Sequence, residues 1–306
     1  MSRADLALLL ICAIWGTTFA LLREALRVLT PAELIALRFT MATIVLALAS
    51  ARHFRGFRLS WLKDGLWIGV WLAIGYLTQA IGLRTVPPSR SAFITSMSIA
   101  FVPFIAFALL RTPPVLGESV GVALAVAGLV LFSSDAGFSL RGGELWTLLG
   151  AAAFAMQIVT THVAGKRSPP LPISVIQTAA GAAAGWTLVL AAGGMRAEPR
   201  AIPWGILLYL AVAATAFIIV LQTWALARTS SVKAGVLYAT EPIFAAIFAI
   251  SFFGDRMTPR EVAGAALILA GVVASELWRP LRARWEARRL SEATAGPGSP
   301  EERGRT

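Results

Sequence analysis

The chain has 306 residues, of which 57% are hydrophobic and only 14% are charged; its formal net charge is +11 and its mean hydropathy is +0.74. A water-soluble domain of this length needs a more polar surface, so the composition excludes one and indicates a chain embedded in lipid. The positive charges lie between and after apolar segments, without the interleaved aromatic residues of a nucleic-acid-binding patch, so no nucleic-acid partner is expected.

Ten apolar segments approach the roughly 20 residues that a helix needs to span a bilayer. In chain order they are 4–23, 32–51, 64–84, 91–111, 117–134, 143–163, 173–193, 204–227, 232–253 and 259–278. After Trp278 the sequence is rich in Arg and then in Gly, Pro, Ser and Glu. We therefore expect residues 279–306 to form a basic, largely disordered tail on the cytoplasmic side.

The distribution of Lys and Arg predicts the topology. Most of these residues fall in the segments that share a side with the N-terminus, which predicts that both termini are cytoplasmic. The 24 Arg against 3 Lys, with abundant Ala, are typical of a GC-rich genome. We expect a multi-pass protein of a plasma membrane, namely a bacterial inner membrane.

An internal repeat is the most specific pattern. Residues 118–130 (ESVGVALAVAGLV) and 261–273 (EVAGAALILAGVV) share seven identities at an offset of 143, and the same offset pairs Gln79 with Gln222. Five helices per copy is an odd number, so the second copy must be inverted relative to the first. The predicted fold is an all-α integral membrane protein of ten transmembrane helices, built as two inverted five-helix repeats, 1–135 and 136–278.

Two prolines fall near the middle of predicted helices 91–111 and 232–253. Pro103 and Pro242 each remove an N–H and free the carbonyl four residues earlier, those of Ile99 and Tyr238. Broken helices at matching places in two repeats point to a substrate site. The alternative is a kink that shapes packing alone, with neighbouring groups satisfying the freed carbonyls.

Two charged residues lie well inside predicted membrane helices, away from the helix ends. Glu241 is the only acid near the middle of one; it binds an amine, carries a coupling proton, or is a structural acid that stays protonated or pairs with a base. Arg38 either extends to the membrane surface, pairs with Glu241, or binds a substrate carboxylate. Both are candidates for ion coupling.

Neutral polar and aromatic residues complete the candidate pathway. Such groups orient small zwitterionic or mixed solutes at modest desolvation cost, although each is equally compatible with helix–helix contact. The candidates are Trp15, Tyr76, Gln79, Ser98, Pro103, Gln157, Gln222, Tyr238, Glu241 and Pro242.

Other classes of function fit poorly. One Cys and two His give no disulfide, no Cys/His metal site and no expected cofactor. No phosphate-binding GxxxxGK[ST] motif is present, which argues against ATP-driven pumping. An integral membrane enzyme acting on lipid needs acid pairs, clustered His or a metal set, so we do not expect an enzyme.

Four motifs carry a family resemblance: IWGTTF at 14–19, ALRF at 36–39, FVPF at 101–104, and EPIFAAIFAISFFGDRMTPREVAGAALILAGV from Glu241 to Val272. With them the chain resembles the drug/metabolite transporter superfamily, of the ten-helix EamA type. The resemblance implies inverted repeats around a central cavity in the lipid bilayer, and a secondary transporter working by alternating access. It implies export of small metabolites such as amino acids, related compounds or drugs. A proton-independent facilitator or channel is the alternative. Proton coupling and a monomer or weak homodimer are expected.

Overall fold

The computed structural model describes residues 1–54, 57–111, 116–132, 142–253 and 258–275, and within these ranges the ordered elements are helices, with no strand. The first half contains α1 (Arg3–Gly16), α2 (Thr18–Ala25), α3 (Pro31–Ser50), the 3-10 turn η1 (Ala51–Phe54), α4 (Leu59–Leu83), α5 (Pro88–Ser96), α6 (Ser98–Leu110) and α7 (Leu116–Phe132). The second half contains α8 (Gly142–Gly165), α9 (Pro170–Ala191), α10 (Trp204–Ala211), the π-helical segment η3 (Val212–Phe217), α11 (Ile218–Leu226), α12 (Ser231–Tyr238) and α13 (Glu241–Phe253). Residues 259–275 are also helical.

Eight helical stretches of the described chain are long and apolar enough to cross a membrane, and Leu116–Leu131 is a further, shorter apolar helix. Their bounds lie within a few residues of the predicted spans. The prediction of an all-helical, multi-span protein is confirmed to this extent, whereas ten spans in two inverted repeats remain a prediction. The proposed tail at 279–306 lies outside the described residues.

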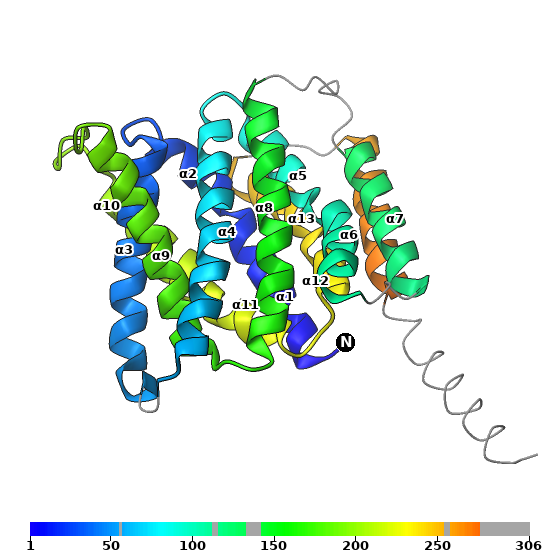
Figure 1. The fold of residues 1–306 in the computed structure, drawn as a ribbon. Coiled ribbons are helices and arrows are strands. Elements are labelled where there is room, and N and C mark those ends of the chain that lie inside the picture. The colour runs from blue at the N-terminus through cyan, green and yellow to red at the C-terminus, as the bar shows by residue number, and fades with distance from the viewer. Residues whose placement is uncertain (55–56, 112–115, 133–141, 254–257, 276–306) are drawn as a thin grey trace, which may run out of the picture.

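Helices of the two halves pack against each other throughout the molecule. In Figure 1, α3 and α4 stand beside α8 and α9, and α1 runs through the centre against α11, α12 and α13. The N-terminus lies at the lower end of this view, with the first residues of α4 and α9. We call this end the N-terminal face; α1, α4, α9 and α12 all begin toward it.

Glycines allow close contacts between the halves. A Cβ atom on Gly185 of α9 would lie 2.6 Å from the backbone nitrogen of Ala36 in α3, and one on Gly69 of α4 would lie 2.6 Å from the Cβ of Ala180 in α9. Real Cβ atoms do not approach other atoms this closely. The helices α3 and α4 therefore each lie directly against α9, as small residues permit in membrane helices.

Replacing Gly185 with alanine is expected to destabilise the fold by about 1–3 kcal/mol, because the added methyl group must push α9 away from α3. Gly205 in α10 is exposed and has no atom within 4 Å of a hypothetical Cβ, so Gly205→Ala is the matched control and should not destabilise. Thermal unfolding in detergent measures both. Equal melting temperatures for the two variants would show that α3 and α9 are not packed as described.

Two membrane helices are interrupted at corresponding places. The break between α5 and α6 falls at Met97, and the break between α12 and α13 falls at Ala239 and Thr240; Met97 and Thr240 are separated by the 143-residue offset of the repeat. Pro242 directly follows the second break, as predicted. Pro103, by contrast, lies within a continuous α6, and the interruption precedes it. The N–H that Pro103 lacks would have bonded the carbonyl of Ile99 in the first turn of α6, which weakens the helix on that side.

Candidate functional site

A cavity lies at the centre of the molecule, between the two halves. Its free volume is about 40 Å³. At roughly 10–15 Å³ per water, this holds about three waters, so any larger molecule requires the helices to separate. The side chains around it are Trp15, Thr18, Phe19, Arg38, Tyr76, Gln79, Thr95, Ser96, Ser98, Phe154, Gln157, Ile158, Gln222, Tyr238 and Glu241.

The interrupted helices meet at this cavity. Ser98 and Glu241 are the first residues of α6 and α13, so two helix N-termini, with their partial positive charge, begin there. Ser96 and Tyr238 are the last residues of α5 and α12, so two carbonyl ends also reach it. In secondary transporters of known structure, discontinuous helices place unpaired backbone groups and dipole ends around the substrate site.

Arg38 is the positively charged group of the cavity and is only 1% exposed. Its Nε donates to Thr215 Oγ1 at 2.6 Å and its Nη2 donates to the carbonyl of Ala214 at 3.1 Å. The guanidinium carbon lies 4.5 Å from the centre of the Tyr76 ring. Its Nη1 has no hydrogen-bond partner among the described residues. This burial excludes extension of the side chain to the membrane surface.

The partners of Arg38 come from the π-helical segment η3. A π-helical turn shifts the backbone hydrogen bonds by one residue, which leaves carbonyls available to side chains. The carbonyl of Ala214 accepts from Arg38 and also from Trp15 Nε1 at 3.4 Å, while Thr215 Oγ1 donates to the carbonyl of Leu210 at 2.7 Å. η3 in the second half therefore holds two cavity side chains of the first half.

Glutamines form two buried hydrogen-bonded pairs at the cavity. Gln79 Nε2 donates to Thr95 Oγ1 at 3.1 Å, within the first half. Gln157 Nε2 donates to Gln222 Oε1 at 3.0 Å, within the second half. The repeat-related Gln79 and Gln222 thus both line the cavity, each with a different partner.

Glu241 is the acidic group of the cavity lining and is 6% exposed. Among the described residues no ion pair forms between Glu241 and Arg38 or any other base. Its position at the first residue of α13 places the carboxyl group beside a helix N-terminus. The cavity therefore presents one base and one acid that do not neutralise each other.

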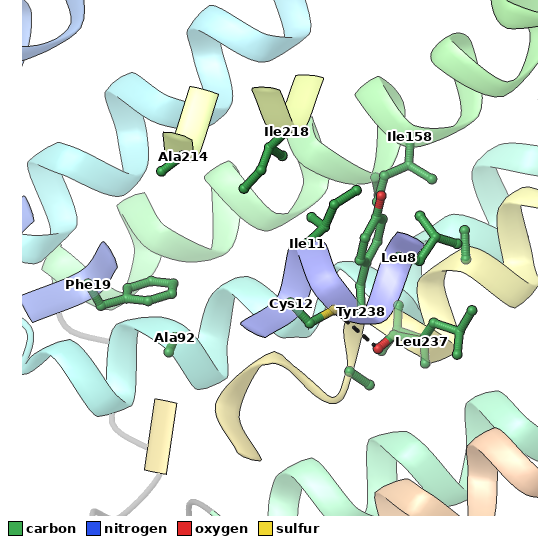
Figure 2. Close-up of a cluster of buried hydrophobic side chains, with 14 of the residues drawn as sticks. Leu8, Ile11, Cys12, Phe19, Ala92, Ile158, Ala214, Ile218, Leu237 and Tyr238 are labelled. Carbon is green, nitrogen blue, oxygen red and sulfur yellow. Dashed lines mark hydrogen bonds between the residues drawn. The ribbon is translucent and has the colours of Figure 1, made fainter. Parts of the chain in front are cut away.

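Aromatic rings form the apolar walls. The ring centres of Trp15 and Tyr238 are 5.6 Å apart, and Tyr76 makes an edge-on contact with Phe154 at 5.2 Å. Figure 2 shows Phe19 and Tyr238 among the buried side chains around α1. Ring faces and edges suit an apolar or aromatic part of a solute, while the polar groups orient its charged ends.

Most of the predicted site residues come together here. The cavity contains Trp15, Arg38, Tyr76, Gln79, Ser98, Gln157, Gln222, Tyr238 and Glu241. Pro103 and Pro242 are not part of its lining, although Pro242 directly follows Glu241, which is. Sequence reasoning missed Thr18, Phe19, Ser96, Phe154 and Ile158 as lining residues. Phe19 is part of the IWGTTF motif, which was the available signal for it.

Known proteins resemble this chain over most of its length. An "uncharacterized transporter" of Archaeoglobus fulgidus is 28% identical over 276 residues, which cover 88% of this chain and 84% of that protein. A WAT1-related chloroplastic protein of Arabidopsis thaliana is 24% identical over 298 residues, covering 84% of this chain and 66% of that protein. A solved crystal structure shares the fold with a TM-score of 0.73 at 20% identity, covering 92% of this chain and 99% of that one.

A family model identifies the chain. The model of the EamA-like transporter family matches residues 2–134 and again residues 141–276. Together the two matches cover nearly all of the described helices. The chain is a multi-pass membrane protein of the EamA-like transporter family.

Proposed function

We propose that this transporter is a secondary carrier that exports small amino-acid-like metabolites by alternating access. The observation that supports this proposal most strongly is the presence of two opposite charges, not paired with each other, in one cavity. Arg38 has an N–H without a partner, and Glu241 has no ion pair among the described residues. Both face the same space between the two halves.

A zwitterionic solute fits this arrangement. An isolated buried charge is costly in an apolar medium, so each of these groups gains from a partner of opposite sign. A solute carboxylate placed on Arg38 would accept from Nη1, and a solute amine near Glu241 would donate to its carboxylate. The rings of Trp15, Tyr76 and Phe154 would contact the rest of the solute.

The same proposal includes the movement of the two halves, the membrane topology and the coupling to protons. Residues 1–135 and 136–278 act as inverted halves that rock about the cavity. Both termini lie in the cytoplasm of a bacterial cell, whose plasma membrane holds the protein. Glu241 holds the solute ammonium group and a proton in turn: the empty carboxylate takes up a proton from outside and releases it to the cytoplasm when the next solute binds, which couples export to inward proton movement.

Efflux from proteoliposomes tests this function. Vesicles with the purified protein are loaded in turn with amino acids, amines and small drugs, and efflux is followed with and without a pH gradient. We expect zwitterions to leave several-fold faster than from protein-free vesicles, and a gradient to accelerate them further. Efflux that ignores the gradient indicates a facilitator, and a steady ion current indicates a channel. Efflux of no zwitterion at all would refute the proposed substrate class.

A further inference from the structure

A second pair of opposite charges lies outside the cavity. Lys233 Nζ of α12 is 2.7 Å from Asp5 Oδ1 of α1, and both side chains are 1% exposed. The other carboxylate oxygen, Asp5 Oδ2, accepts from the backbone N–H of Ser2 at 2.5 Å. The pair thus joins the first helix of the first half to a helix of the second half, fully enclosed by protein.

A buried ion pair of this kind need not stabilise the folded protein. Removing two charges from water is expensive, and replacing a buried ion pair by apolar side chains of similar size is often neutral or stabilising. Breaking only one partner, by contrast, leaves an uncompensated buried charge. A buried ion pair is therefore suited to a contact that forms in one state and is hydrated in another.

The pair lies on the N-terminal side of the cavity, at a distance set by the helices. Asp5 precedes Trp15 by ten residues of α1, about 15 Å at 1.5 Å per residue, and Lys233 precedes Tyr238 by five residues, about 7 Å. Trp15 and Tyr238 line the cavity. Any solute path from the cavity to the N-terminal face that runs between α1 and α12 must pass the ion pair.

An apolar layer separates the ion pair from the cavity. Leu8, Ile11 and Cys12 of α1 and Leu237 of α12 are all fully buried. Figure 2 shows these side chains packed together, with Cys12 Sγ donating to the carbonyl of Leu237 at 3.5 Å. The contact between α1 and α12 is therefore closed in two successive layers, one charged and one apolar.

We propose that Asp5 and Lys233 form the gate that closes the central cavity toward the N-terminal face. In the structure described here the gate is shut. Opening this face separates α1 from α12, exposes both charges to water and opens the apolar layer behind them. The role as a gate for solute rests on the proposed function, but the opening itself does not require a known solute.

The sole cysteine of the chain reports directly on this gate. Cys12 lies behind the ion pair, so its reaction with a membrane-impermeant maleimide measures opening. With reagent on the N-terminal face of proteoliposomes, Asp5→Asn and Lys233→Met should each raise the labelling rate of Cys12 at least about tenfold. Glu24→Gln, which breaks the exposed Glu24–Arg27 pair of α2, is the control and should label like wild type. Labelling of both gate variants at the wild-type rate would overturn the proposal, whether or not any solute is transported.

An apolar double variant covers the case in which the single variants do not fold. Asp5→Leu combined with Lys233→Met removes both charges, so the melting temperature should fall only by the small cost of the lost Ser2–Asp5 cap, and Cys12 should stay protected. In the double variant no charged side chain is hydrated when the gate opens, so opening becomes less favourable. Solute efflux should therefore fall at least tenfold. A folded double variant that exports at the wild-type rate would show that the pair is only structural.

Discussion

Replacing Arg38 with methionine is expected to reduce export of zwitterionic solutes at least about 100-fold. Methionine keeps much of the buried volume but removes the charge, the donors to Thr215 and Ala214, and the free Nη1. A hydrogen bond to a charged group contributes about 1.5–3 kcal/mol, and 100-fold corresponds to about 2.8 kcal/mol. The loss of the solute carboxylate's partner alone accounts for an effect of this size. Initial efflux rates from proteoliposomes measure it.

The matched control for this change is Arg27→Met. Arg27 lies just after α2 and is 71% exposed, with Glu24 as its partner. Its replacement should leave efflux unchanged, because exposed ion pairs contribute little to stability and Arg27 does not line the cavity. Arg38→Lys keeps the charge but not the planar guanidinium group, so its efflux rate should lie between those of Arg38→Met and Arg27→Met. Wild-type efflux of zwitterions by a folded Arg38→Met protein would remove Arg38 from the solute site.

Replacing Glu241 with glutamine is expected to abolish the acceleration of export by a pH gradient, while exchange of solute across the membrane continues. The amide keeps the size of the side chain and its place at the start of α13, but it cannot take up or release a proton. Stimulation by the gradient should drop from several-fold in the wild type to none. Efflux with and without the gradient, from the same vesicles, measures the difference.

Glu198→Gln is the matched control for Glu241. Glu198 is exposed in the connection between α9 and α10, away from the cavity, so its variant should respond to the gradient like the wild type. If Glu241→Gln also kept its full response, proton coupling would have to lie elsewhere. If it lost exchange together with coupling, the neutral amide oxygen would not be able to replace the carboxylate as the partner of the solute amine.

Much of the helical framework could be predicted from the sequence, because a membrane helix requires a long apolar segment that is visible without any tertiary information. The interruption before Glu241 could also be anticipated from Pro242. The interruption at Met97 could not be placed, since Pro103 lies six residues beyond it. The π-helical segment Val212–Phe217 carries no proline and no distinctive composition, so nothing in the sequence indicated it.

The candidate site was accessible to sequence reasoning where it uses polar residues. Arg38, Gln79, Gln222 and Glu241 stand out because polar groups are rare in apolar helices. Phe154 and Ile158 do not stand out, because a lining residue of this kind is identical in type to a lipid-facing one. The Asp5–Lys233 pair was missed for another reason. Both residues lie close to a helix end, where charges ordinarily face water, and only the packing of α1 against α12 reveals their burial.

Counterflow into proteoliposomes tests the central claim most directly, namely that the cavity between the halves carries an amino-acid-like solute by alternating access. Labelled solute is supplied outside, and the vesicles contain either buffer or the same unlabelled solute. A carrier whose site faces one side at a time predicts saturable uptake that internal solute stimulates several-fold, and that Arg38→Met abolishes. Uptake equal to that of protein-free vesicles for every zwitterion, or uptake that internal solute does not stimulate, would contradict the account.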